Sequence, residues 1–135
     1  LDESPWQTAA HELREESGYV LDDLTVLQPT VRIDKLTDVV VHPVPVVMNT
    51  HTYGDDAAHY HSDTAYALVA HGEPTLEIDE GETQQLEWLS LAELSDLTDK
   101  DIYRNTKEIY MFILSELLHN WVEVPTSVFS IDNPT

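Results

Sequence analysis

The spacing of apolar residues changes along the chain, and the first stretch has the spacing of a helix. Ser4 and Gln7 stand three residues apart, as in a capping box, and Pro5 between them suits the first helical position. Gly18 is a typical helix stop. Within this stretch one side collects the apolar residues Trp6, Ala9, Ala10 and Leu13. The pattern predicts a helix of about four turns between Ser4 and Gly18.

The middle of the chain changes to the spacing and composition of strands. Residues 25–33 and 38–49 are rich in Val, Leu and Thr and predict strands, although Pro29, Pro43 and Pro45 restrict them to edge or bulged courses. Four further elements are predicted: a polar loop over 50–63, a buried strand over 64–70, an acidic loop over 72–82 and a short strand over 86–89.

The C-terminal part returns to helical spacing. Residues 90–97 open with a capping box and predict a short helix, and residues 105–121 carry the longest apolar stripe. The stripe consists of Tyr110, Ile113, Leu114, Leu117, Leu118 and Trp121. It has two natural partners, the sheet or a second copy of the chain in a homodimer. We predict one α/β domain over residues 1–123, followed by an extended tail over residues 124–135 that contains two prolines.

The charge of the chain limits the kinds of molecule that it can bind. Among 135 residues, 26 are acidic and 6 basic, which gives a formal net charge of −20. With so little Lys and Arg, nucleic-acid polymers and anionic membrane surfaces are excluded as partners. The chain has no cysteine, no apolar run long enough to span a membrane and no secretory signal pattern, so we expect a cytoplasmic protein. The acid excess also suits a concentrated salt solution, where self-repulsion is screened.

Three glutamates share one side of the predicted N-terminal helix. Glu12, Glu15 and Glu16 are three and four residues apart, and the Glu12–Glu16 pair of like charges costs roughly 0.2–0.5 kcal/mol. Two interpretations follow: a solvated acidic face, or a face that binds a hard divalent cation through carboxylate oxygens.

A longer pattern around this helix resembles a known family. Residues 3–19, ESPWQTAAHELREESGY, resemble the second part of the Nudix box, whose pattern is G, five residues, E, seven residues, R-E-U-x-E-E-x-G-U with U apolar. In that comparison His11 stands where the family has Arg. The matching positions are Glu3, Glu12, Leu13, Glu15, Glu16, Gly18 and Tyr19. Downstream, residues 59–70 and 81–94 resemble the later core strand, acidic loop and Trp turn of Nudix domains, so the resemblance covers about residues 1–97.

The resemblance implies a Nudix-like α/β/α sandwich with a mixed sheet. The leading Gly of the box would lie before Leu1, so the family's N-terminal strands are expected to be missing from this chain. The second departure is His11, because a histidine cannot reproduce the two-bond fork with which the family Arg orients a glutamate. Activity is therefore expected to be impaired relative to a complete box.

The resemblance also implies a chemistry. The expected reaction is Mg²⁺- or Mn²⁺-dependent hydrolysis of a nucleoside diphosphate linked to another moiety, with a small nucleotide-type molecule as substrate. Glu12, Glu15 and Glu16 would hold the metal, and Glu15 or Glu16 would act on water. Glu3, His11 and Gly18 would have orienting and structural roles. Glu82, with Glu80 as second choice, is the expected further base, and a solvated loop acid is the other interpretation.

Several remaining residues are weaker candidates. His59 and His61 lie in an H-x-H-x-D run that suits substrate contacts, a metal site or simply the start of a strand. Tyr66 is either a substrate contact or a core residue. We expect ordinary surface or core roles for His42, His51, His71 and His119. The competing function, favoured by His11, is a non-catalytic Nudix-like module that binds nucleotides or regulates another protein.

Overall fold

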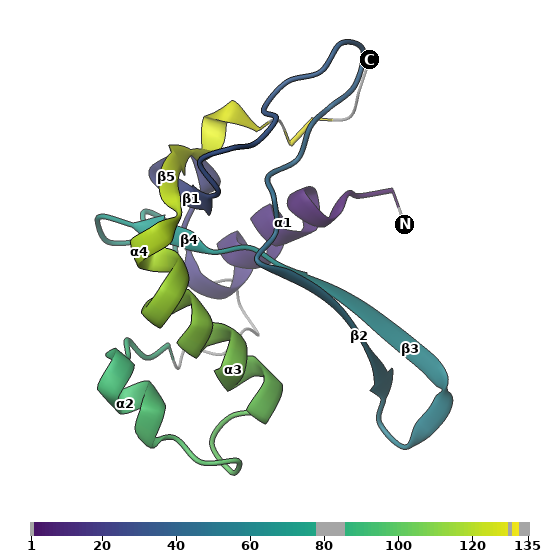
Figure 1. Cartoon of the computed structure of the whole chain (residues 1–135), viewed down its shortest axis with the longest axis vertical. Coiled ribbons are helices and arrows are strands. Elements are labelled where there is room, and N and C mark those ends of the chain that lie inside the picture. The colour runs from purple at the N-terminus through teal and green to yellow at the C-terminus, as the bar shows by residue number, and fades with distance from the viewer. Residues whose placement is uncertain (1, 78–85, 130, 133–135) are drawn as a thin grey trace.

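The computed structural model describes residues 2–77, 86–129, 131 and 132 (Figure 1). The helices are α1 (Pro5–Ser17), α2 (Leu91–Asp96), α3 (Arg104–Phe112) and α4 (Leu118–Asn120), with a π-helical segment, Ile113–Leu117, joining the last two. The strands are β1 (Leu24–Gln28), β2 (Val47–Tyr53), β3 (Asp56–Ala65), β4 (Leu68–Ala70) and β5 (Val122–Pro125). Short 3₁₀ turns cover Leu21–Asp23 and Thr126–Val128.

A three-stranded sheet lies between two helical layers. Its strand order is β4-β1-β5, and the central position of Val26 pairs with Leu68 on one side and Val124 on the other. Successive residues of a strand point to opposite faces. Val26 accordingly packs with Trp6 of α1, whereas the next residue, Leu27, packs in a second cluster with Leu117 of the C-terminal helix.

This arrangement confirms the predicted α/β class with helices on both faces of a sheet. The strand directions differ from the expectation of a mixed sheet, because β4 and β5 both run antiparallel to β1 and β2 runs antiparallel to β3. Among the described residues no parallel pair is found. The stripe of the long helix contacts the sheet, since Ile113 and Trp121 also pack against the second cluster.

The ends of α1 form as the sequence predicts. The Ser4 hydroxyl accepts a hydrogen bond from the backbone N–H of Gln7 at 3.2 Å, and the Ser4 N–H donates to the Gln7 side chain at 2.7 Å. This capping box satisfies donors that the first helical turn leaves without partners. Trp6 is fully buried beneath the helix, and Gly18 ends it in the left-handed conformation.

The region predicted as a polar loop over 50–63 is instead most of a β-hairpin. Strands β2 and β3 pair antiparallel, with His51 directly opposite His61, and turn at Gly54. The hairpin leaves the body of the molecule as a separate ribbon (Figure 1). Most of its side chains are therefore exposed, and the polarity of this stretch did not exclude strands. The prediction of a loop was wrong because it assumed that a strand needs a buried face.

Two strand predictions were too long, and a third predicted strand does not form. Strand β1 stops at Gln28, just before Pro29, and residues 29–46 form an irregular excursion before β2. The buried side chain of Gln28 holds this excursion, because its amide donates to the Val44 carbonyl and accepts from the Val44 N–H, each at 2.8 Å. Residues 86–89 are exposed and form no strand, because no neighbouring strand lies beside them in the described chain.

The helices near the C-terminus match the prediction, and the tail differs in part. Helix α2 begins with a capping box at Ser90, and the long helix runs from Arg104 to Asn120 with the π-helical segment inside it. In the predicted tail, Val124 belongs to β5, and Phe129 is 3% exposed in the cluster around Trp6. The first part of the tail therefore completes the sheet and core, while the domain boundary at residue 123 stays a prediction.

Candidate functional site

The outer face of α1 carries the predicted carboxylates. Glu12, Glu15 and Glu16 are exposed, and their spacing places their Cβ atoms one turn apart on one side of the helix. Carboxylate oxygens are the ligands that Mg²⁺ and Mn²⁺ prefer. In the described ranges, however, no three His, Asp or Glu side chains are gathered closely enough to hold a metal ion. The donor chemistry fits a divalent cation, and these side chains would have to rotate to share one.

A contact at the start of α1 joins two of the predicted structural residues. The His11 Nδ1 lies 2.8 Å from Glu3 Oε1, with both side chains about half exposed. Thr8 donates a longer hydrogen bond, 3.4 Å, to the other oxygen of Glu3. The segment before the helix is thereby attached to the second turn of α1. The structure brings Glu3 and His11 together, and their functional roles stay predictions.

The other end of α1 is fixed to the segment that follows β4. Gly18 has φ of +75°, and a Cβ added there would lie 2.0 Å from the Leu76 carbonyl oxygen. The Leu76 N–H donates to the Gly18 carbonyl at 3.0 Å, and the Tyr19 hydroxyl donates to the Gly72 carbonyl at 2.7 Å. Glycine is therefore required at position 18 both by the left-handed backbone and by the close approach of residues 72–76.

Of the remaining candidates, Glu80 and Glu82 lie outside the described residues. Tyr66 is half-buried in the core, with its ring 5.0 Å from that of Trp6 in an edge-to-face arrangement, and burial raises the pKa of its hydroxyl. This placement favours the core interpretation of Tyr66. His59 and His61 both lie on β3, exposed on the hairpin.

Around His61 the hairpin holds a cluster that sequence analysis missed. The ring of His61 stacks on Tyr53 with centroids 4.7 Å apart and lies 5.7 Å from the ring of His51. His51 Nε2 is 2.8 Å from Asp63 Oδ2, and its Nδ1 is 3.1 Å from the Thr52 carbonyl. Because both partners of His51 accept hydrogen bonds from the charged ring, the pKa of this histidine is raised, first by the Thr52 carbonyl and then by Asp63.

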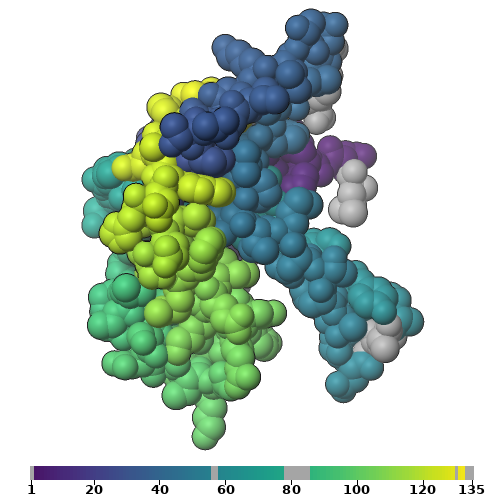
Figure 2. All heavy atoms as spheres, in the orientation of Figure 1, coloured from purple at the N-terminus to yellow at the C-terminus, as the bar shows by residue number. Residues whose placement is uncertain are grey.

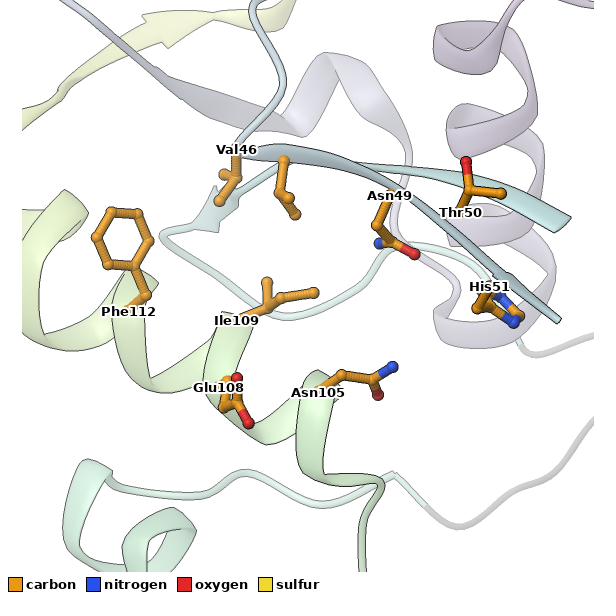
Figure 3. A pocket seen from close by; sticks show the side chains of 9 residues that line it. Val46, Asn49, Thr50, His51, Asn105, Glu108, Ile109 and Phe112 are labelled. Carbon is orange, nitrogen blue, oxygen red and sulfur yellow. The ribbon is translucent and has the colours of Figure 1, made fainter.

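A groove lies between the hairpin and α3, and Figure 2 shows the hairpin standing away from that helix. One hollow of about 450 Å³ is lined by Val46, Val47, Asn49, Thr50, His51, Asn105, Glu108, Ile109 and Phe112 (Figure 3). A second hollow of about 870 Å³ shares four of these residues and adds Thr52, Tyr53, Gly54, Asp63 and Tyr103. We treat the two hollows as one groove and call it the hairpin–α3 groove. One side of this groove is formed by the hairpin. The sequence feature that could have predicted a strand there is the alternation of Thr with His and Tyr over residues 50–53.

Comparison with known proteins assigns the family. Within the described chain, no helix is both long and apolar enough to cross a membrane. Neither a curated protein nor a solved structure matches the sequence. A family model described as the NUDIX domain matches residues 1–111, which include α1, its flanking contacts and all of α3 except its last residue. Because this match covers most of the 135 residues, the chain belongs to the Nudix family.

Proposed function

We propose that this protein is a metal-dependent hydrolase of nucleoside diphosphate-linked compounds. Membership of the Nudix family supports hydrolysis of small nucleotide-type substrates as the class of reaction. Within this chain, the observation that supports the proposal is the exposed glutamate face of α1. The segment before this helix is attached to it by the contact between Glu3 and His11.

Glu12, Glu15 and Glu16 would hold Mg²⁺ or Mn²⁺. A bound divalent cation supplies charge neutralisation for the diphosphate and lowers the pKa of a bound water. The protein's part is to present the carboxylates from a helix that is held at both ends. The capping box at Ser4 fixes one end of α1, and the hydrogen bond between Gly18 and Leu76 fixes the other. We further propose that Glu15 or Glu16 orients the attacking water and that Glu82 assists as a base.

The substrate arrives at a chain of net charge −20. A free diphosphate would be repelled by this charge, whereas a diphosphate that carries its own divalent cation has much of its charge neutralised. This balance supports a metal complex as the form in which substrate is bound. It also supports small molecules over nucleic-acid polymers as partners.

His11 supports a second candidate, a non-catalytic module that binds nucleotides. The contact between His11 and Glu3 uses one ring nitrogen, so it orients the carboxylate less rigidly than the two-bond fork of an arginine. If that looser contact fails to hold the acidic face in a productive arrangement, binding would survive without turnover.

A turnover assay separates the two candidates. Phosphate and nucleotide release would be measured with a panel of nucleoside diphosphate-linked compounds in the presence of Mg²⁺ or Mn²⁺. The hydrolase is supported by turnover of at least one compound that disappears in Glu16→Gln, with Glu116→Gln as the matched control on the exposed side of the C-terminal helix. Binding of nucleotides without turnover of any compound would establish the module instead.

A further inference from the structure

The hairpin–α3 groove has an apolar end and a polar end. At the apolar end, Val46 and Val47 of the hairpin side face Ile109 and Phe112 of α3. Figure 3 shows Ile109 pointing from the helix toward β2, and Asn49 pointing from β2 toward the helix. The size of the hollow and its mixture of apolar walls with a few polar groups are typical of small-molecule sites.

Charge decides which part of a nucleotide such a groove could take. Its ionisable lining residues include the acids Glu108 and Asp63, and neither hollow is lined by a described Lys or Arg. The ring of His51 does not offer a free donor, because both nitrogens are occupied by Thr52 and Asp63. Phosphate groups would therefore be disfavoured inside the groove, and a neutral group rich in hydrogen-bond donors would be favoured.

Two carboxamides provide directional recognition from opposite walls. Asn49 projects from β2 and Asn105 from the first turn of α3, and both line both hollows together with Ile109. Within the part of the chain that the structure describes, the Asn49 side chain has no hydrogen-bond partner, and Asn105 accepts only a long contact of 3.5 Å from Thr106. An asparagine carboxamide can bind an exocyclic amino group and the neighbouring ring nitrogen of a base at the same time.

We propose that the hairpin–α3 groove binds an amino-bearing heterocyclic base, with its ring against Ile109 and its amino edge on Asn49 and Asn105. The carboxylate of Glu108 accepts further hydrogen bonds from such an edge, and the phosphates of a nucleotide remain outside the groove. That this base is part of the substrate rests on the proposed hydrolase function. The groove's preference for amino-bearing rings does not depend on that function.

Equilibrium binding tests the preference without any turnover. Adenosine and purine riboside are both uncharged, and they differ in the exocyclic amino group. Each would be titrated into isotopically labelled protein without metal, and NMR would follow the side-chain amides of Asn49 and Asn105 and the methyl groups of Ile109. We expect adenosine to shift these signals and to bind about tenfold more tightly than purine riboside, which corresponds to the loss of one good base contact. A separate, mostly apolar hollow lies elsewhere in the fold, with Leu13, Tyr19 and Trp88 in its lining. Equal affinities, or shifts confined to that hollow, would overturn the proposal.

Single substitutions identify which asparagine side chains bind the base. Asn105→Ala should weaken adenosine binding about tenfold and should reduce the difference between the two ligands. Asn105→Asp keeps the shape of the side chain and serves if the alanine variant fails to fold. Asn120→Ala, on α4 and outside the groove, should leave both affinities unchanged. An Asn105→Ala protein with unaltered affinity and unaltered selectivity would contradict the assignment.

The outcomes separate this inference from the proposed function. Selective adenosine binding in the groove of a protein that hydrolyses no panel compound would support the inference and overturn the hydrolase. Hydrolysis with a KM that is unchanged in Asn105→Ala and the same for amino-bearing and amino-free bases would support the hydrolase and overturn the inference.

Discussion

The imidazole of His11 reaches back along the first turns of α1 to the carboxylate of Glu3, with 2.8 Å between Nδ1 and Oε1. The residue that the Nudix pattern places at this position is an arginine. An arginine would reach the same carboxylate with two parallel hydrogen bonds and would remain charged at every accessible pH. The contact thus gives His11 a carboxylate partner through one ring nitrogen, which is less rigid than the two bonds of an arginine.

Restoring the arginine should improve catalysis. We expect His11→Arg to raise kcat for any compound that the protein hydrolyses, because a two-bond contact fixes Glu3 and the start of the acidic face more firmly. Steady-state kinetics would measure the change. His119→Arg, which adds the same charge to an exposed position of α4, is the control. If kcat were unchanged in His11→Arg, the histidine would not be what limits activity.

Gly18 should tolerate no side chain. Adding a Cβ in the left-handed conformation costs about 1–2 kcal/mol, and contact with the Leu76 carbonyl at 2.0 Å would force a backbone shift in addition. We therefore expect Gly18→Ala to lower the free energy of unfolding by at least about 2 kcal/mol, measured by chemical denaturation. Gly72→Ala is the matched control, because no atom lies within 4 Å of its added Cβ. Equal stabilities of the two variants would show that residues 72–76 do not approach Gly18 as described.

The sequence was informative wherever local chemistry decides local structure. The capping boxes at Ser4 and Ser90 and the stop at Gly18 depend on residues within one turn, and all three form as predicted. Helical geometry alone also places Glu12, Glu15 and Glu16 on one exposed side of α1. The apolar stripe of the long helix was also visible, since its period is independent of what it packs against.

The features that the sequence did not predict depend on contacts between residues that are far apart in the chain. The predicted loop over 50–63 became β2 and β3, because Thr, His and Tyr form strands readily when a partner strand is available. The hairpin–α3 groove joins Asn49 with Asn105, which are far apart in the chain, so no spacing rule could connect them. Val124 and Phe129 entered the core because β1 pairs with β5, which the prolines of this segment obscured.

The hairpin should respond to pH through His51. Its pKa is raised above the ordinary value of 6.5 by the Thr52 carbonyl and by Asp63. A raised pKa in the folded state means that the stabilisation of β2–β3 pairing is complete below about pH 6.5 and is lost as pH rises through the folded-state pKa. NMR titration of the His51 ring should give a lower pKa in Asp63→Asn than in the wild-type protein. The protection of the β3 amides against hydrogen exchange, relative to an unfolded chain, should fall as pH rises through the His51 pKa. An identical His51 titration in the variant would show that the contact does not form.

Salt should stabilise the fold. With 26 acidic against 6 basic residues, repulsion between carboxylates opposes folding, and screening of that repulsion increases as the Debye length falls from about 10 Å at 0.1 M to about 3 Å at 1 M. We expect the thermal unfolding midpoint to rise over this range of KCl concentration. A midpoint that stayed constant or fell would exclude self-repulsion as a significant destabilising force in this protein.

The most direct test of the central claim is the dependence of hydrolysis on Mg²⁺ in the wild-type protein and in Glu15→Gln. Release of product from a nucleoside diphosphate-linked compound would be followed while Mg²⁺ is titrated, with Glu116→Gln as control. We predict turnover that requires Mg²⁺, a loss of at least about a hundredfold in kcat for Glu15→Gln, and normal turnover in the control. Turnover that is independent of Mg²⁺, or that survives in Glu15→Gln, would contradict the assignment of catalysis to the glutamate face of α1.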